Sequence, residues 1–157
     1  MTIWWRLRTA MIGLLSKRAI VYGYHGTSLD SANSILMSGF ETSRNDYDWL
    51  GEGVYFFQDA PQRAWEWAEN RHSHPAVISA LIEINHFIDL LDIGWFEILA
   101  ESHHLLVDEY SRTGRQIPYQ DAESGARWLD CAVIDFTVAR VENQGNAKIY
   151  GVRAAFP

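Results

Sequence analysis

Two short segments concentrate the chemically useful groups of this chain. The first is Tyr24-His25-Gly26-Thr27, and the second is Leu50-Gly51-Glu52-Gly53-Val54-Tyr55-Phe56. An imidazole at the end of a strand can hydrogen-bond a sugar hydroxyl, and a glycine lets its own N–H and C=O approach a ligand. A small hydroxyl adds a polar contact, and a phenol ring offers a flat surface for stacking. Together these groups could hold a ribose and a flat aromatic amide.

In their order, the two segments and the alanine-rich stretch after them resemble the N-terminal catalytic region of the ADP-ribosyltransferase fold. The resemblance is to the branch that includes poly(ADP-ribose) polymerases and related bacterial toxins. In that branch an H-G-S/T motif precedes a helix, a loop and a G-x-G-V/I-Y-F strand. The similarity runs from about Ile20 to Phe156 and is strongest up to about Asp92. It implies an α+β fold with a split, mostly antiparallel sheet and flanking helices.

The resemblance also implies a substrate and a set of site residues. NAD would be the substrate, and its ADP-ribose would pass to a macromolecular acceptor, either a protein or a nucleic acid. His25 would grip the ribose and Tyr55 would stack on nicotinamide, so that the two face each other across a slot for the pyridine ring. The further NAD-binding candidates are Gly26, Thr27, Gly53 and Trp65, with Trp67 close behind the last of these.

A third group, a carboxylate that steadies the ribosyl cation, depends on how residues 129–141 fold. Their apolar residues fit a helical period, although several β-branched residues favour a strand. As part of a strand, Asp130 could supply the carboxylate. We expect a helix, which removes Asp130 from this role. The third residue would then be expected beyond Pro157, or the carboxylate would come from elsewhere, for which Glu142 is a poor candidate, or the enzyme would have reduced activity.

Composition narrows the function classes. With 157 residues and 48% hydrophobic content, the chain can bury one core, which predicts a single domain over residues 20–157, truncated if a further strand is needed. Thirteen Lys and Arg against 20 Asp and Glu give a net charge of −7, which disfavours stable binding of nucleic acid. The single cysteine, Cys131, favours a reducing, cytoplasmic location. We expect no metal, because His104 and Asp108 lack a partner motif.

Residues 1–19 are predicted to form an amphipathic helix ahead of this domain. Arg6 and Arg8 interrupt the apolar run, which argues against a signal peptide, and the segment is too short and too charged to span a bilayer. The expected role is docking on the core, and contact with a membrane surface or a partner is the alternative.

Local patterns predict the remaining elements. Strands are expected over residues 20–24, 53–57, 76–85 and 147–156, with an extended segment over 87–92. One helix should begin after Ser28 and end at Gly39 in the left-handed conformation. A second should be capped by Asp59 with Pro61 in its first turn, and a third should cover residues 95–110 with Phe96, Leu99, Leu106 and Tyr110 on its apolar stripe.

Three functions follow from these observations. The favoured one is NAD-dependent ADP-ribosyl transfer by a bacterial toxin or phage-defence effector, controlled by an antitoxin or another regulatory partner. The first alternative is a catalytically inactive module that binds NAD or ADP-ribose, or a partner-regulated fragment. The second is an RNA 2′-phosphotransferase, whose members also use an H-G-T segment. Such an enzyme needs basic residues aimed at an RNA phosphate, and this acidic chain shows no such cluster.

Overall fold

The chain divides into two compact units. The computed structural model describes residues 18–43, 45, 48–120, 126–145 and 147–155. The strand unit consists of Arg18–Ser43 and Gly53–Ile84, and the helical unit includes Arg44–Glu52 and Asn85–Pro157. The helix expected over residues 1–19 lies outside the described residues as far as residue 17, and Ala19 already begins a strand.

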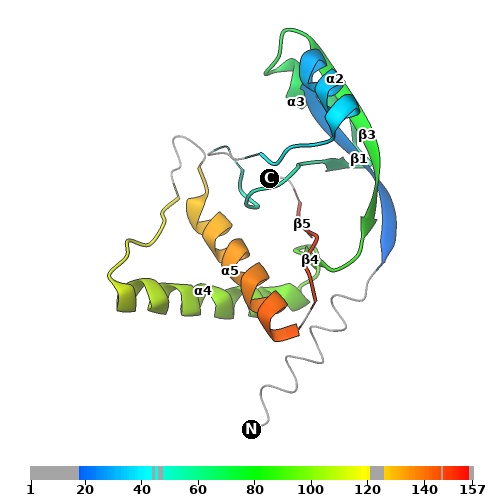
Figure 1. The fold of residues 1–157 in the computed structure, drawn as a ribbon. Helices are drawn as coiled ribbons and strands as arrows, with labels where there is room; N and C mark the ends of the chain where they lie inside the picture. The colour runs from blue at the N-terminus through cyan, green and yellow to red at the C-terminus, as the bar shows by residue number, and fades with distance from the viewer. Residues whose placement is uncertain (1–17, 44, 46–47, 121–125, 146, 156–157) are drawn as a thin grey trace. The chain divides into compact units, whose positions relative to one another are not determined.

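The strand unit is built on a three-stranded antiparallel sheet with the order β2-β1-β3. Its elements in chain order are β1 (Ala19–Ser28), α2 (Leu29–Ser38), β2 (Phe57–Gln58), α3 (Pro61–Glu69) and β3 (Pro75–Ile84) (Figure 1). β1 pairs with β3 along its whole length, from Ala19↔Ile84 to Ser28↔Pro75. It pairs with β2 only at Gly23↔Gln58 and Tyr24↔Phe57.

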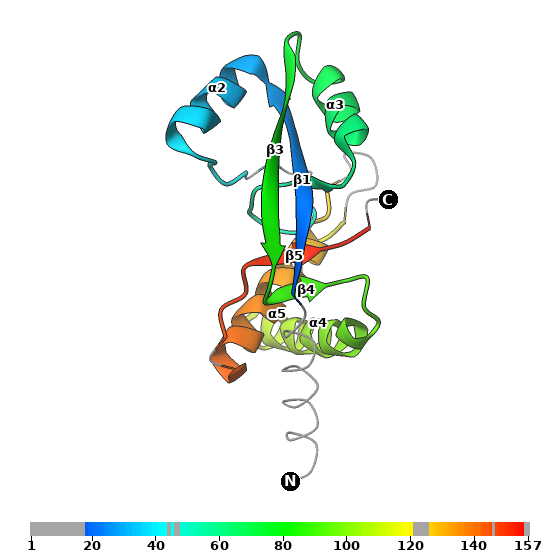
Figure 2. The ribbon, with the colours of Figure 1, turned by 90° about the vertical axis from the view of Figure 1, so that its right-hand side faces the viewer.

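The helices α2 and α3 lie on opposite sides of the paired strands β1 and β3 (Figure 2). α3 buries Ala64 and Ala68 and packs tightly on β1, because a Cβ atom built on Gly26 would collide with the carbonyl oxygen of Ala64. Side chains alternate between the faces of a strand. Tyr24 and Gly26 therefore lie on the face that α3 covers, the α3 face, whereas His25 lies on the opposite α2 face.

In the strand unit, β1 and β2 differ from the sequence-based expectation. β1 continues to Ser28, so His25 lies within the strand and not at its end. Its length follows from β3, which offers an antiparallel partner to every residue from Ala19 to Ser28. β2, by contrast, contains only Phe57 and Gln58. Tyr55 therefore precedes the strand, and Gly53 forms an isolated bridge with Ser43.

The ends of α2 and α3 follow simple local chemistry. Ser28 caps α2 as expected, since its Oγ accepts from the Ser31 N–H over 3.1 Å. Gly39 ends α2 at φ 90° and ψ 178°, a region open to glycine but distinct from the expected left-handed helical one. Pro61 occupies the first turn of α3 as expected, but Asp59 is not its cap. Asp59 has φ 51°, and its N–H donates to the carbonyl of Tyr22.

The helical unit contains β4 (Phe87–Asp89), α4 (Gly94–Thr113), α5 (Trp128–Gly145) and β5 (Gly151–Arg153), with β4 and β5 parallel. The expected helix over residues 129–141 is thus confirmed, while the last strand is shorter than expected. The prediction of the apolar stripe of α4 was partly wrong, because the Phe96 side chain is 54% exposed. The buried core of the unit consists of Ile88, Trp95, Ile98, Val141 and Ile149.

In the described part of the chain, helices thus combine with a mostly antiparallel set of strand pairs, which confirms the α+β class. None of the helices described is both long enough and apolar enough to cross a lipid bilayer.

The close approach of α3 to β1 gives a first testable prediction. Gly26→Ala should destabilise the protein by about 1–3 kcal/mol, because the new methyl group would push α3 away from the sheet. Gly53→Ala is the matched control, since a Cβ atom at Gly53 would meet nothing within 4 Å. Denaturant unfolding measures both variants, and equal stability of the two would contradict the proposed packing.

Candidate functional site

The imidazole of His25 is held by the main chain of the Tyr55 segment. His25 Nδ1 lies 2.9 Å from the carbonyl oxygen of Tyr55. A carbonyl oxygen only accepts, so Nδ1 carries the proton in this bond. In the neutral ring, Nε2 is then the nitrogen with a free lone pair, which makes it an acceptor for a hydroxyl group.

Two phenylalanine rings fix the orientation of this imidazole. The His25 ring centroid lies 5.4 Å from that of Phe40 and 5.8 Å from that of Phe56. The two phenylalanine centroids are 5.2 Å apart, in an edge-to-face arrangement. The direct link between His25 and Tyr55 is therefore through the Tyr55 backbone, and the rings around the imidazole come from Phe40 and Phe56.

The main-chain N–H and C=O of Gly26 point to the edge of β1 that pairs with β2, just beyond the last paired residue, Tyr24. Asp59 N–H donates to the Tyr22 carbonyl over 2.8 Å, so the main chain of Tyr22 faces β2. Main-chain groups of alternate residues face the same neighbour in an antiparallel strand, and those of Tyr24 and Gly26 therefore face the same side. Pairing with β2 stops at Tyr24↔Phe57. Within the described residues, Gly26 thus presents its N–H and C=O one step beyond the ladder.

Thr27 and Gly53 occupy contrasting surroundings. Thr27 follows His25 by two residues and shares its face of the sheet, where it is only 8% exposed. Gly53 has open space where a side chain would be, although its carbonyl accepts from the Ser43 N–H over 2.8 Å. Of the two, Gly53 offers room for a ligand, whereas Thr27 is packed.

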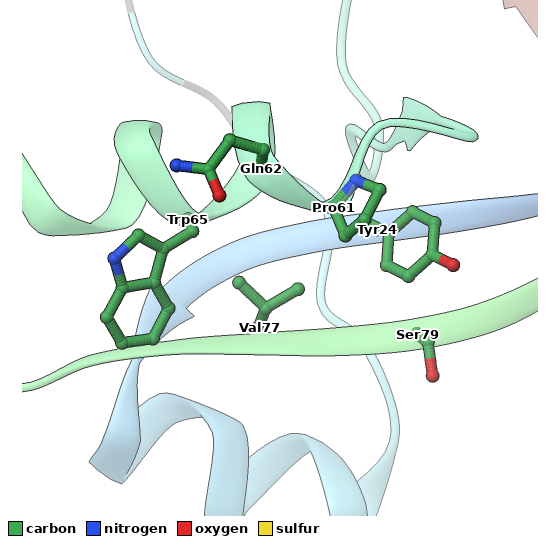
Figure 3. A pocket seen from close by; sticks show the side chains of 6 residues that line it. All are labelled: Tyr24, Pro61, Gln62, Trp65, Val77 and Ser79. Carbon is green, nitrogen blue, oxygen red and sulfur yellow. The ribbon is translucent and has the colours of Figure 1, made fainter.

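The two tryptophans of α3 lie on different sides of the helix. Trp65 is 40% exposed and lines an open hollow of about 460 Å³, with Tyr24 at the other end and Val77 between them (Figure 3). Pro61, Gln62 and Ser79 complete this hollow. Trp67 instead lies beside Phe57 of β2, with ring centroids 6.2 Å apart, and Arg71 stacks over it. Trp67 is therefore the tryptophan on the side of the segment that carries Tyr55.

Asp130 and Glu142, the two carboxylates considered as the third catalytic group, form hydrogen bonds within the helical unit. Asp130 lies in the first turn of α5, where it accepts from Gln120 Nε2 over 2.6 Å and pairs with Arg127 over 3.4 Å. Glu142 accepts from the Ile149 N–H over 2.8 Å. Because Asp130 is helical, the role that required it on a strand is lost.

The start of the second motif is anchored to α5 within the helical unit. The Cys131 thiol donates to the carbonyl of Asp48, and Asp135 Oδ1 lies so close to Gly51 that a Cβ there would be 2.8 Å from it. Gly51 also has φ 90°, so both conformation and space require glycine. Burial raises the pKa of the Cys131 thiol, which therefore stays protonated as a donor.

Asp135 also has a raised pKa, chiefly because burial removes water from its carboxyl group and secondly because of the Glu52 carboxylate. The Leu50-Gly51-Glu52 part of the motif thus has a structural role in the helical unit.

Sequence reasoning missed the two phenylalanines around His25. Phe56 could have been found from the alternation next to Tyr55, whereas nothing in the sequence connects Phe40 to His25. The sequence analysis preferred Trp65 to Trp67 as the second stacking ring, because helical spacing alone does not show which side of α3 faces β2. Comparisons of the chain with protein-family models, curated proteins and solved structures give no match.

The raised pKa of Asp135 predicts a pH-dependent gain in stability on its neutralisation. Since the folded-state pKa lies above the unfolded value, the contribution of this group is present at low pH and is lost as the pH rises through the folded-state pKa. Asp135→Asn should therefore raise the melting temperature at neutral pH, and the gain should vanish in acid.

Thermal unfolding of wild type and variant across a pH series measures this effect. Glu52→Gln is the matched control, because it removes the neighbouring charge and should lower the pKa of Asp135 in an NMR titration. A lower melting temperature of Asp135→Asn at neutral pH would refute the assignment.

Proposed function

We propose that this chain binds NAD in the strand unit and transfers its ADP-ribose to a macromolecular acceptor. The observation that carries the proposal is the backbone of Gly26, presented beyond the end of β2 and beside the His25–Tyr55 hydrogen bond. The reaction would break the bond between ribose C1′ and the nicotinamide nitrogen. The bonding pair leaves with nicotinamide, and an acceptor nucleophile bonds to C1′ and gives up its proton.

A carboxamide is suited to the open position at Gly26. Like a residue of a neighbouring strand, it carries one N–H donor and one C=O acceptor on the same side. It could therefore lie opposite Gly26, where the chain before Phe57 is no longer part of the β1–β2 ladder, and pair with both main-chain groups of Gly26. The nicotinamide ring would then lie near Tyr55, and the open space at Gly53 leaves room beside it.

His25 is suited to the ribose. Its Nδ1 proton is committed to the Tyr55 carbonyl, so Nε2 of the neutral ring accepts a hydrogen bond from a ribose hydroxyl. Phe40 and Phe56 restrict the ring to one orientation, so little freedom is lost on binding. Trp67, beside Phe57, is the preferred second stacking ring under this proposal.

The position of Asp130 favours a second candidate function, the catalytically inactive module that binds NAD or ADP-ribose. A ribosyl cation needs a nearby negative charge, and the Asp130 carboxylate, in the first turn of α5, is instead engaged with Gln120 and Arg127, which precede this helix. A module of this kind would use the same Gly26 edge and His25 for binding alone. If the chain is a transferase, we propose that it acts as a toxin or phage-defence effector controlled by a regulatory partner.

One experiment separates the two functions. The protein is incubated with NAD labelled on its adenylate phosphate and with a cell lysate, beside His25→Ala and Tyr55→Ala. We expect wild type to transfer label and both variants to lose activity on the order of a hundredfold, because each removes a positioning contact. Protection by NAD against thermal unfolding without transfer would identify the binding module. If the protein shows no transfer of label and no protection by NAD, both functions are contradicted.

The two tryptophans of α3 provide a matched pair for the location of the site. Trp67→Ala should weaken NAD binding about three- to tenfold, through loss of a stacking surface. Trp65→Ala should leave NAD affinity unchanged, because Trp65 faces the hollow next to β3. Calorimetric titration with NAD measures both, and a larger effect at Trp65 would place the ligand on the other side of α3.

A further inference from the structure

The strand β3 has an outer edge that no described strand covers. It is the last strand in the order β2-β1-β3, and it is ten residues long. The main chain of Tyr22 faces β2, so the alternate residues Val21 and Gly23 face β3. Their partners Ile82 and Ala80 face back toward β1. The residues of β3 that alternate with these inward-facing positions therefore direct their N–H and C=O groups outward, and they include Val77, Ser79, Leu81 and Glu83.

Pro75 agrees with this assignment. It stands at the first residue of β3 and belongs to the outward series, where its missing N–H costs no hydrogen bond within the sheet. On the other side, the Leu29 N–H donates to the carbonyl of His74 over 2.8 Å, as expected for a residue that faces inward.

This edge lacks the devices that usually protect a terminal strand. Such strands are normally short, bulged or lined with charge, especially lysine. The register of β3 against β1 runs without a bulge, and its sequence PAVISALIEI contains no basic residue and one acidic residue. Leu81 is 67% exposed and lies in the middle of the outward series. A long edge without a bulge or a basic residue is suited to pairing with another strand.

We propose that β3 pairs with β3 of a second copy of this chain, antiparallel and centred on Ala80, to form one continuous sheet across a two-fold axis. In this register Ser79 of each copy lies opposite Leu81 of the other, and Glu83 lies opposite Val77. No charged residue faces its own kind, which would disfavour pairing. The contact is symmetric, so each favourable pair occurs twice.

The hollow beside Trp65 gives this register a side-chain contact. Ser79 and Val77 belong to its lining and point to the α3 face, as does Leu81. Residues directly opposite across an antiparallel pair have Cβ atoms about 5 Å apart. Leu81 of the second copy would therefore lie beside Ser79, at the rim of the hollow that Tyr24 and Trp65 also line (Figure 3). The second copy is favoured as occupant because its own β3 supplies both the strand and this leucine.

Sedimentation velocity over a wide concentration series tests the proposal on the full-length chain. Wild type should show a reversible monomer–dimer equilibrium. Ser79→Pro removes an outward N–H without touching the β1–β3 ladder, and Leu81→Lys puts a cation on the edge. Each should weaken the dimer by more than about tenfold. Ile20→Lys is the matched control, since Ile20 is 73% exposed on the same face but lies on β1.

Cysteine cross-linking tests the register. In a Cys131→Ser background, a mixture of Ser79→Cys and Leu81→Cys should form a disulfide between copies, because opposed Cα atoms lie within disulfide range. Either variant alone should cross-link far less, since the register does not oppose a residue to itself.

Three results would overturn the self-pairing. These are a monomer at every concentration, a dimer that both edge variants leave intact, and cross-linking of Ser79→Cys to itself in place of Leu81→Cys. A monomeric wild type that binds strand-forming peptides would assign the edge to a foreign partner and would equally refute the second copy. Circular dichroism of each variant shows whether the fold is retained, and Leu81→Lys, at an exposed position, keeps the test valid if Ser79→Pro unfolds.

Discussion

The uninterrupted antiparallel ladder between β1 and β3 is the constraint on which the strand unit depends. Because every residue from Ala19 to Ser28 has a partner, the alternation of side chains and main-chain groups is fixed along the whole strand. His25 must face α2, Gly26 must face α3, and the main-chain groups of Gly26 must point toward β2. A shift of one residue would exchange all of these directions at once.

This constraint separates roles that share a motif. The Gly26 position needs glycine because α3 packs directly on it, and the same close packing leaves its backbone accessible only along the strand edge. His25 turns to the opposite face, where its ring lies beside Phe40 and Phe56 and its Nδ1–H donates a hydrogen bond to the Tyr55 carbonyl. Trp67, assigned to the proposed NAD site, and the hollow at Trp65 lie on different sides of α3, so the two proposals can be tested independently.

Much of the local structure was predictable because local forces decide it. Ser28 caps α2 through its own hydroxyl, Pro61 suits a first helical turn, and the alternation in residues 76–85 is typical of a strand. Errors arose where distant partners prevailed. β1 extends beyond its apolar run because β3 pairs with it as far as Ser28. Asp59 does not cap α3, and its N–H donates instead to the carbonyl of Tyr22. Residues 129–141 form a helix although several of them are β-branched. Asp130 therefore does not lie on a strand, as the proposed catalytic carboxylate would require.

The sequence by itself determined the α+β class, the main helices and strands, and the pairing of chemically capable residues in two motifs. It could do so because periodicity, caps and turns act over a few residues. Only the tertiary structure decided that His25 bonds the Tyr55 backbone, that Phe40 and Phe56 lie beside its ring, and that Trp67 is the tryptophan of α3 next to β2. Those relations depend on strand register and on contacts between residues far apart in the chain, which no local pattern encodes.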